Sequence, residues 1–424
     1  MKRLAGLALA ATMLPLGAQA GEAGDAVVAH LYAGTASAGL SAANEACSTA
    51  DSEACYGLGL LTLVTTYEGL SQDLYRYGAT VPSNAAFELL MGGGGGSGPA
   101  PANLQPEKLT YDALRGVFDR FLSGLDDARD AFERAGEAGD YVITIDPLKV
   151  RIDFNGDGKV DEGETLAALL SQFDDNTFPP PAPTGKTKSK TPDEPLLTTV
   201  GFDRADALWF AGYTQIVAAP IDLLLAHDFS NFYNAYLHRV FPLSGLPMGE
   251  FNTAGDLFLG AETDASIADL IAGIHTLSFP VTDQARLAGV LDRLKAITDL
   301  SRQNWDAILA ETDDNRELVP SPRQTSILPG HSVSQQTVDA WMATLDTIDE
   351  VLDGKLLVPH WRFAKGVDLK AYFDTAKQTD LVLLISGSAI LPYLKDGPIA
   401  DAQSFAKANE AFGADWLNYV FWFN

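Results

Sequence analysis

The sequence lacks most of the short motifs that mark common active sites. It has no HExxH zinc motif, no CxxC pair, no GxSxG nucleophile motif and no GxxxxGK[ST] phosphate-binding loop. Ser386 and Ser388 in LLISGSAIL are not flanked by glycines in the places that a serine nucleophile requires. The glycine run at residues 92–96 is linker-like, because it does not lead from a strand into a helix. The sequence therefore gives no support to the enzyme classes that these motifs define.

Basic residues are also scarce. The chain of 424 residues has 29 Lys and Arg against 56 Asp and Glu, a formal net charge of −27. Phosphate binding needs clustered Lys and Arg, so this balance argues against nucleic-acid partners and against anionic lipids. An acidic surface favours solubility and attracts divalent cations. A plain solubilising surface explains the charge equally well.

Long apolar runs are absent beyond the N-terminus. The first 20 residues, MKRLAGLALAATMLPLGAQA, combine Lys2 and Arg3 with a short apolar run and a small-x-small sequence that ends at Ala20. The run is too short to span a bilayer, so we predict a secretory signal peptide of bacterial style, cleaved after Ala20. No later segment has the roughly 20 uninterrupted apolar residues of a transmembrane helix. We expect a mature chain from Gly21, located in the periplasm or secreted.

The only two cysteines, Cys47 and Cys55, lie close together in CSTADSEAC. In an oxidising compartment such a pair favours a disulfide over a metal site. On one continuous helix the two residues would be about 12 Å apart, too far for a disulfide. The chain must therefore turn between them, with Asp51 or Ser52 as the cap of the following helix. We expect the disulfide to join two helices where they meet.

Apolar residues at three- and four-residue spacing predict a mainly α-helical fold, a multi-helix orthogonal or bundle-like globule with long loops and little β-structure. Thr110 is expected to cap one strongly amphipathic helix and Gly136 to end it. Residues 141–146 are the one expected strand. The final FGADWLNYVFWF is too aromatic to be left in water, so we predict that it docks into the core. The expected helices cover residues 56–77, 110–135, 164–173, 204–225, 230–240, 265–276, 284–309, 335–352, 380–393 and 405–424.

Two polar segments interrupt this pattern. Residues 91–106 are rich in Gly and Pro, and residues 179–195 are rich in Pro and Lys, so both read as flexible loops. The helices before the first segment are too few to build a core. We therefore expect residues 21–424 to form one mainly helical domain, with a division near residues 176–200 as the alternative.

One motif stands out, DFNGDGKVDEGE at residues 153–164. It places oxygen donors at alternate positions and a glycine, Gly158, where a sharp turn needs positive φ. The segment resembles the calcium-binding loop of EF-hands, and the resemblance covers these 12 residues only. Calcium prefers six to eight such hard oxygen ligands. The resemblance implies a Ca²⁺ site with these ligands, in which Lys159 contributes only its backbone carbonyl: Asp153, Asn155, Asp157, Lys159, Asp161 and Glu164.

The loop also departs from the EF-hand pattern. EF-hands usually occur in pairs, and no second loop is present; residues 312–317, TDDNRE, lack the glycine and the closing Glu. The preceding ITIDPLKVRI, with Pro147, is a poor entering helix. A calcium sensor exposes a Met-rich groove, but none of the five Met lies beside the loop. We therefore expect a structural calcium site rather than a sensor.

No catalytic cluster is evident elsewhere. His227 and His238 lie on neighbouring predicted helices and could meet, but a structural role is favoured over metal or acid–base work. VPHWRF at residues 358–363 brings His360, Trp361 and Arg362 together, which favours a hydrogen-bonded corner with a cation–π contact over a binding wall. The histidines are scattered and form no close ligand pair: His30, His227, His238, His275, His331 and His360.

Three further segments resemble parts of large exported bacterial proteins of unknown function. They are residues 74–78 (LYRYG), residues 357–374 (LVPHWRF and VDLKAYFD) and residues 381–394 (LVLLISGSAILPYL). This resemblance implies no activity. We expect an exported, non-catalytic binding or scaffold protein of the cell envelope, with an unknown protein or small-molecule ligand. The alternatives are a periplasmic hydrolase-like enzyme whose site is assembled from scattered residues, and a calcium sensor.

Overall fold

The computed structural model describes residues 21–80, 103–170, 199–249, 261–314, 316–327, 332–413 and 416–423. The expected signal peptide, the cleavage site at Ala20, most of the first loop and all of the second lie outside these residues, as does His331. Within them the protein is mainly α-helical, as predicted, with short antiparallel strand pairs.

The elements of the N-terminal half are α1 (Glu22–Ala33), α2 (Ala36–Ser48), α3 (Ser52–Arg76), α5 (Tyr111–Glu137), β1 (Ile143–Ile145), η1 (Pro147–Lys149), α6 (Leu166–Leu170), β2 (Val200–Phe202), α7 (Arg204–Leu225), α8 (Ser230–Tyr236) and η2 (Leu237–Arg239). Those of the C-terminal half are α9 (Ala261–His275), β3 (Ser278–Pro280), α10 (Gln284–Ala310), α11 (Gln335–Leu352), β4 (Gly366–Val367), α12 (Leu369–Thr375), β5 (Gln378–Asp380), α13 (Leu381–Ser386), η3 (Ser388–Tyr393), β6 (Leu394–Lys395), α14 (Ala406–Phe412) and α15 (Trp416–Phe423).

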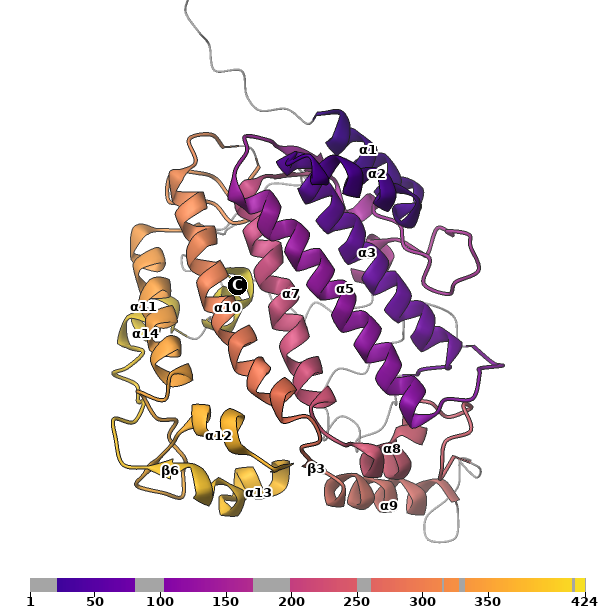
Figure 1. Ribbon diagram of the computed structural model, residues 1–424, viewed down its shortest axis with the longest axis vertical. Coiled ribbons are helices and arrows are strands. Elements are labelled where there is room, and N and C mark those ends of the chain that lie inside the picture. Colours follow the sequence, from indigo (N-terminus) through magenta and orange to yellow (C-terminus); the bar gives the residue numbers. More distant parts are fainter. Residues whose placement is uncertain are drawn as a thin grey trace, which may run out of the picture.

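Four long helices form the centre of the molecule. In Figure 1, α3, α5, α7 and α10 lie side by side in that order, with α11 and α14 beyond α10. Helices α1 and α2 cover one end of α3, while α8, α9 and α13 lie at the opposite end of the molecule. The loop at residues 153–164 follows β1. Strand β1 pairs directly with β2, which comes after residues 171–198 in the sequence.

The caps explain where several helices begin. Thr110 accepts a hydrogen bond from the backbone of Ala113, as expected of the residue that starts α5. Gly136 does not end that helix, contrary to the prediction. It lies inside α5, where a Cβ atom would approach Leu208 of α7 to 2.6 Å. The glycine is required by close packing of α5 on α7 rather than by a left-handed cap.

Two other predictions need correction. Residues 380–393 are not one helix, because Gly387 adopts φ 104° and separates α13 from η3. The predicted C-terminal helix is likewise divided into α14 and α15. Helices α1 and α12 were not predicted, and α2 was expected only as the helix that carries Cys47, without bounds; the Ala and Gly residues of α1 and α2 give only a weak apolar stripe. The docking of the C-terminus is confirmed, since Phe423 is fully buried against Trp305 and Trp341.

An ion-pair network ties the central helices together. Arg293 of α10 donates to both carboxylate oxygens of Asp126 on α5, at 2.7 and 2.8 Å, and to Gln215 on α7 at 3.0 Å. It also pairs with Asp222 of α7. The hydrogen bonds that Arg293 donates to Asp126, together with its contacts to Asp222, raise the pKa of Arg293. Because the guanidinium of Arg293 is bidentate and has several acceptors, its positive charge can be partly buried between the helices.

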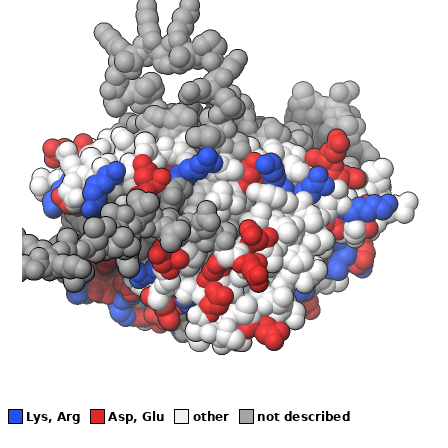
Figure 2. Space-filling view, turned by 90° about the horizontal axis from the view of Figure 1, so that it is seen from above, with Lys and Arg blue, Asp and Glu red and all other residues white. Residues whose placement is uncertain are grey.

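Helix α7 is the one described helix whose length and apolar composition would suit a membrane span, and half of its apolar window is buried. It packs between α5 and α10 and presents buried polar side chains, among them Gln215 and Asp222. The core helix of a soluble protein shows the same length and composition. Figure 2, which looks onto the end that carries α1, shows acidic and basic side chains interspersed on that face.

Candidate metal-binding loop and acidic cluster

The loop at residues 153–164 is closed at its base by backbone pairing. Ile152 donates to the carbonyl of Glu164 at 3.1 Å, and Leu166 donates to the carbonyl of Val150 at 2.9 Å. The chain enters through the short 3-10 turn η1 rather than a helix, as expected from Pro147. The loop is therefore held by two short extended segments and by the start of α6.

The first predicted ligand organises the loop from inside. One carboxylate oxygen of Asp153 accepts from the backbone N–H of Gly156 at 2.7 Å and the other from that of Gly158 at 2.9 Å. Gly158 has φ 76°, the left-handed conformation predicted for this position. The sequence thus gave the correct reason for the glycine: a residue with a Cβ would be strained here.

The side chains at positions 3 and 5 of the loop make the next two turns. Asn155 accepts from the backbone of Asp157 at 2.8 Å, and Asp157 accepts from the backbone of Lys159 at 2.8 Å. Both are hydrogen bonds to the residue two positions ahead, which Asp and Asn favour in turns. Lys159 is exposed, so its ammonium group points away from the loop interior.

The closing residue lies at the other end of the loop. Glu164 is 6% exposed and accepts from the backbone N–H groups of Phe154 at 3.1 Å and Asp161 at 2.9 Å. The sequence predicted that Glu164 would lie in the first turn of the following helix, but α6 begins only at Leu166, so Glu164 precedes it. The residue that caps α6 is Thr165, whose hydroxyl accepts from Ala168. The carboxylate of Glu164 therefore spans the two ends of the loop.

The missing partner loop is replaced by α1 and α2. In paired EF-hands, position 8 pairs with the second loop; here that residue, Val160, packs against the turn between α1 and α2. A Cβ atom on Gly34 would lie 2.5 Å from the side chain of Val160. Arg151 also donates its backbone N–H to the carbonyl of Leu31, the last turn of α1. The loop is thus seated on the N-terminal helices.

Helix α3 supplies a carboxylate that the sequence did not predict. Glu68 accepts from the backbone N–H of Asp153 at 2.9 Å, and Gln72 donates to the carbonyl of Asp153 at 2.9 Å. Burial raises the pKa of Glu68, the hydrogen bond from Asp153 opposes this, and the charges of Asp153 and Glu164 raise it further. Because Glu68 is 85 residues from Asp153, no local pattern could have indicated it.

The residues present fit a calcium ion in chemistry, since all the predicted donors are oxygens. Their arrangement is that of a loop organised by its own backbone: Asp153, Asp157 and Glu164 accept N–H groups, and no three carboxylates of the loop have oxygens within 4.8 Å of one another. Among the described residues, one other group meets that distance, made of Asp203, Glu311 and Glu317.

This second group, the acidic cluster, is assembled where α7 begins and α10 ends; we define it as Asp203, Asp206, Glu311 and Glu317. Asp203 caps α7 by accepting from Ala205 at 2.7 Å, and Asp206 accepts from the backbone of Asp203 at 2.9 Å. Gln324 donates to Glu311 at 2.9 Å. Two of the four carboxyls, Asp206 and Glu317, are buried, at 7% and 4% exposure.

Burial and mutual repulsion raise the pKa of three of these carboxyls. Burial, followed by the charge of Asp203, raises the pKa of Glu311 to about 9. Burial, opposed by backbone hydrogen bonds, raises the pKa of Asp203 to about 6. Burial together with the charge of Asp203 raises the pKa of Asp206 strongly. Like charges in a buried group are relieved by shared protons or by a cation. The only signal in the sequence was the acidic TDDNRE, which contains Glu317.

The remaining candidate residues have structural roles. His227 lies between the carbonyl of Leu223 and the hydroxyl of Thr379, both at 2.6 Å, and burial lowers its pKa. His238 contacts Asp269 at 3.1 Å, and the structure does not bring the two histidines together as sequence reasoning had allowed. Each of the two histidines therefore joins separate segments of the chain.

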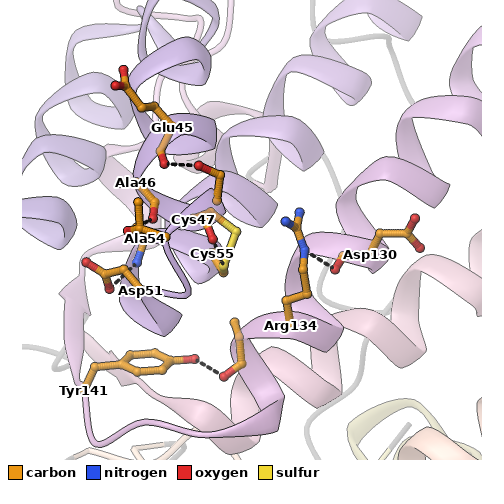
Figure 3. Close-up of a disulfide and its surroundings, with 12 residues drawn as sticks. Glu45, Ala46, Cys47, Asp51, Ala54, Cys55, Asp130, Arg134 and Tyr141 are labelled. Carbon is orange, nitrogen blue, oxygen red and sulfur yellow. Dashed lines mark hydrogen bonds between the residues drawn. A yellow bond between two sulfur atoms is a disulfide. The ribbon is translucent and has the colours of Figure 1, made fainter.

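The predicted disulfide is present. Cys47 lies in the last turn of α2 and Cys55 in the first turn of α3, with Cα atoms 4.5 Å apart. Asp51 caps α3 by accepting from Ala54, so the turn between the cysteines is the one predicted (Figure 3). A disulfide is what an oxidising compartment permits.

The side chain of Arg362 lies 4.4 Å from the ring of Trp361, the cation–π contact that the sequence favoured. A depression between α5, α7 and α10 is open and lined partly by acidic groups, among them Glu133, Glu137 and Asp299. The chain matches no family model, and no curated protein or solved structure proved significantly similar to it.

Proposed function

We propose that this protein is an exported, non-catalytic binding protein of the cell envelope, held together in part by one calcium ion in the loop at residues 153–164. The observation that carries the calcium site is the pair of carboxylates at the two ends of the loop. Asp153 and Glu164 are both buried and both face into the loop, with Gly158 in the required turn. Two more carboxylates and an amide follow at the remaining positions.

The role of the ion is structural in this proposal. The loop is seated on α1, α2 and α3 through backbone hydrogen bonds and side chains that leave no pair of free helices to open. A bound cation would neutralise Asp153, Glu164 and Glu68, whose negative charges lie close together. Calcium thus joins the N-terminal helices to the segment that follows β1, instead of exposing a groove.

Binding rather than catalysis is supported by the surface. Large exposed apolar side chains gather at the end of the molecule that carries α9 and α13, including Ile271 and Ile385. Exposed apolar clusters of this kind mark interaction sites. The disulfide between Cys47 and Cys55 and the basic, then apolar N-terminal segment support export to the periplasm or beyond.

The calcium site is tested by unfolding the chain from Gly21 with calcium and with chelator. At tenfold saturation the ion contributes about 1.4 kcal/mol, a rise in Tm of roughly 1–3 °C. The variant Asp153→Ala/Glu164→Gln should lose the rise. The control Glu45→Gln/Asp306→Asn, which removes two exposed charges elsewhere, should keep it.

Elemental analysis of the purified chain provides a second readout, with one calcium per chain expected. An unchanged Tm together with no bound calcium would refute the site. A large change in near-ultraviolet circular dichroism on chelation would favour a sensor over the structural role.

A further inference from the structure

Large exposed apolar side chains form a continuous feature around α13, which we call the apolar ridge. Their exposed fractions are 41–44% for Leu381, Val382 and Leu383, 56% for Leu391, and 73% for Ile385 and Trp361. Helix α13 has no buried residue although its sequence, LVLLIS, is almost wholly apolar. An apolar helix that buries nothing in its own fold presents its side chains to something else.

The start of α13 is firmly anchored. Strand β5 leads into it and pairs with β3, with Asp380 opposite Ser278. The backbone of Leu381 donates to the carbonyl of Leu277 at 2.9 Å, and the Asp380 carboxylate caps the helix by accepting from Leu383 at 2.8 Å. The C-terminal end of α9 therefore meets the start of α13. The exposed residues Ile267, Ile271 and Ile274 of α9 extend the apolar end of the molecule (Figure 1).

The other end of α13 is held by the VPHWRF segment. The indole N–H of Trp361 donates to the carbonyl of Ile385 at 3.0 Å, and a ring nitrogen of His360 lies 3.3 Å from the carbonyl of Leu384. Gly387 allows this contact, since a Cβ atom there would approach Phe363 to 3.0 Å. Trp361 thus satisfies its polar atom internally and leaves its ring exposed. A ridge fixed in this way loses little conformational entropy on binding.

The ridge also carries positive charge, in contrast to the rest of the chain. Arg362 lies over the ring of Trp361 at 4.4 Å and has no acidic partner among the described residues. Residues 353–396 contain six Lys or Arg and five Asp, which is close to balance in a chain of net charge −27. Four of the lysines pair with Asp, which leaves Arg362 and Lys377 as the cations of this region without a carboxylate partner in the described part of the chain. The average charge of the sequence therefore does not describe this region.

We propose that the apolar ridge docks the protein on a lipid bilayer that contains anionic headgroups. Apolar side chains, an exposed tryptophan and a neighbouring arginine are the combination found at the bilayer interface. Helix α13, which carries most of the ridge, lies at one end of the molecule, where it can reach a bilayer surface (Figure 1). At physiological salt the Debye length is about 8 Å, so the acidic remainder of the molecule is largely screened from the contact.

The proposal deepens the proposed binding role and is independent of the calcium site. Its test is flotation of the chain from Gly21 with vesicles of phosphatidylcholine alone and of phosphatidylcholine mixed with phosphatidylglycerol. The chain that starts at Gly21 excludes binding by the apolar N-terminus. Flotation is measured with chelator present, which prevents calcium from bridging the carboxylates of the protein and the phosphates of the lipid. Because calcium is absent from the assay, failure to float would not bear on the calcium proposal.

We expect the protein to float with the mixed vesicles and less with phosphatidylcholine alone. Ile385→Asp should weaken partition into mixed vesicles about tenfold, because it places a charge in the apolar contact. Arg362→Glu should weaken it about fivefold, and only where anionic lipid is present. Leu148→Asp, a substitution at another exposed leucine near α1, should leave partition unchanged, with circular dichroism confirming that all variants fold.

Several results would overturn the proposal. Failure of the wild type to float with mixed vesicles would do so, as would equal flotation of Ile385→Asp and the wild type. A dimer in light scattering that Ile385→Asp dissociates, without any flotation, would identify a second copy of the chain as the occupant of the ridge. Binding of an acidic protein partner to the ridge, without flotation, would likewise overturn the bilayer proposal and identify that protein as the occupant.

Discussion

The loop at residues 153–164 and the acidic cluster are both groups of carboxylates, but they handle charge in opposite ways. In the loop the carboxylates of Asp153, Asp157 and Glu164 accept backbone N–H groups. In the cluster Asp203 and Glu311 lie beside other carboxyls, and burial with the charge of Asp203 raises the pKa of Glu311 to about 9, so that Glu311 holds a proton at neutral pH. The comparison teaches that burial beside other carboxyls raises a carboxyl pKa even where backbone N–H groups are accepted, as at Asp203, whereas the loop keeps its carboxylates apart on separate backbone donors.

The largest expected effect on stability comes from replacing Glu311, the cluster carboxyl with the pKa of about 9. Because the pKa of Glu311 is about 9 when folded and about 4.3 when unfolded, the folded chain binds the extra proton between these values. Stability is therefore lost as pH rises from about 4.5 to 9. Glu311→Gln should flatten this dependence and stabilise the protein at pH 8 by roughly 2–4 kcal/mol.

The measurement is urea unfolding at pH 5 and pH 8. Asp306→Asn, at an exposed carboxylate of α10, should leave the pH dependence as it is in the wild type. If Glu311→Gln leaves the slope unchanged, the cluster does not store the proton. If calcium stabilises the wild type but not Glu311→Gln, the ion binds to the cluster and the contrast with the loop fails.

A smaller effect on stability is expected from changing the backbone conformation of the loop at Gly158. Gly158 and Gly163 both have open space where a Cβ would be added, but only Gly158 has positive φ. Gly158→Ala should therefore destabilise the chain by roughly 1–2 kcal/mol, whereas Gly163→Ala should change stability by less than about 0.5 kcal/mol. Equal effects in urea unfolding with chelator present would show that the turn does not depend on the left-handed residue.

The smallest effect concerns the carboxylate contributed by α3. Glu68→Gln keeps an acceptor for the backbone N–H of Asp153 but removes a charge beside Asp153 and Glu164. We expect the calcium-free chain to gain less than about 1 kcal/mol and calcium affinity to fall a few-fold. Isothermal titration calorimetry compares it with Glu45→Gln, the exposed control. Unchanged affinity in Glu68→Gln would restrict the site to residues 153–164.

Local contacts explain which parts of the structure were predictable. The caps of α3 and α5, at Asp51 and Thr110, involve residues three positions apart, so their sequence patterns sufficed. The break at Gly387 was missed because the residues before Ser386 and after Ser388 are mostly apolar and suggest one helix. Its conformation is matched to the His360 and Phe363 side chains, which come from a separate segment.

The sequence by itself determined the loop, the disulfide turn and the helical character of the chain, because each depends on residues within a few turns of one another. Only the tertiary structure brought Asp203 to Glu311, more than 100 residues away, and Glu68 to Asp153. It also decided that the apolar residues of α13 lie outside the core. Periodicity records how apolar a segment is, whereas packing decides whether another part of the chain covers it.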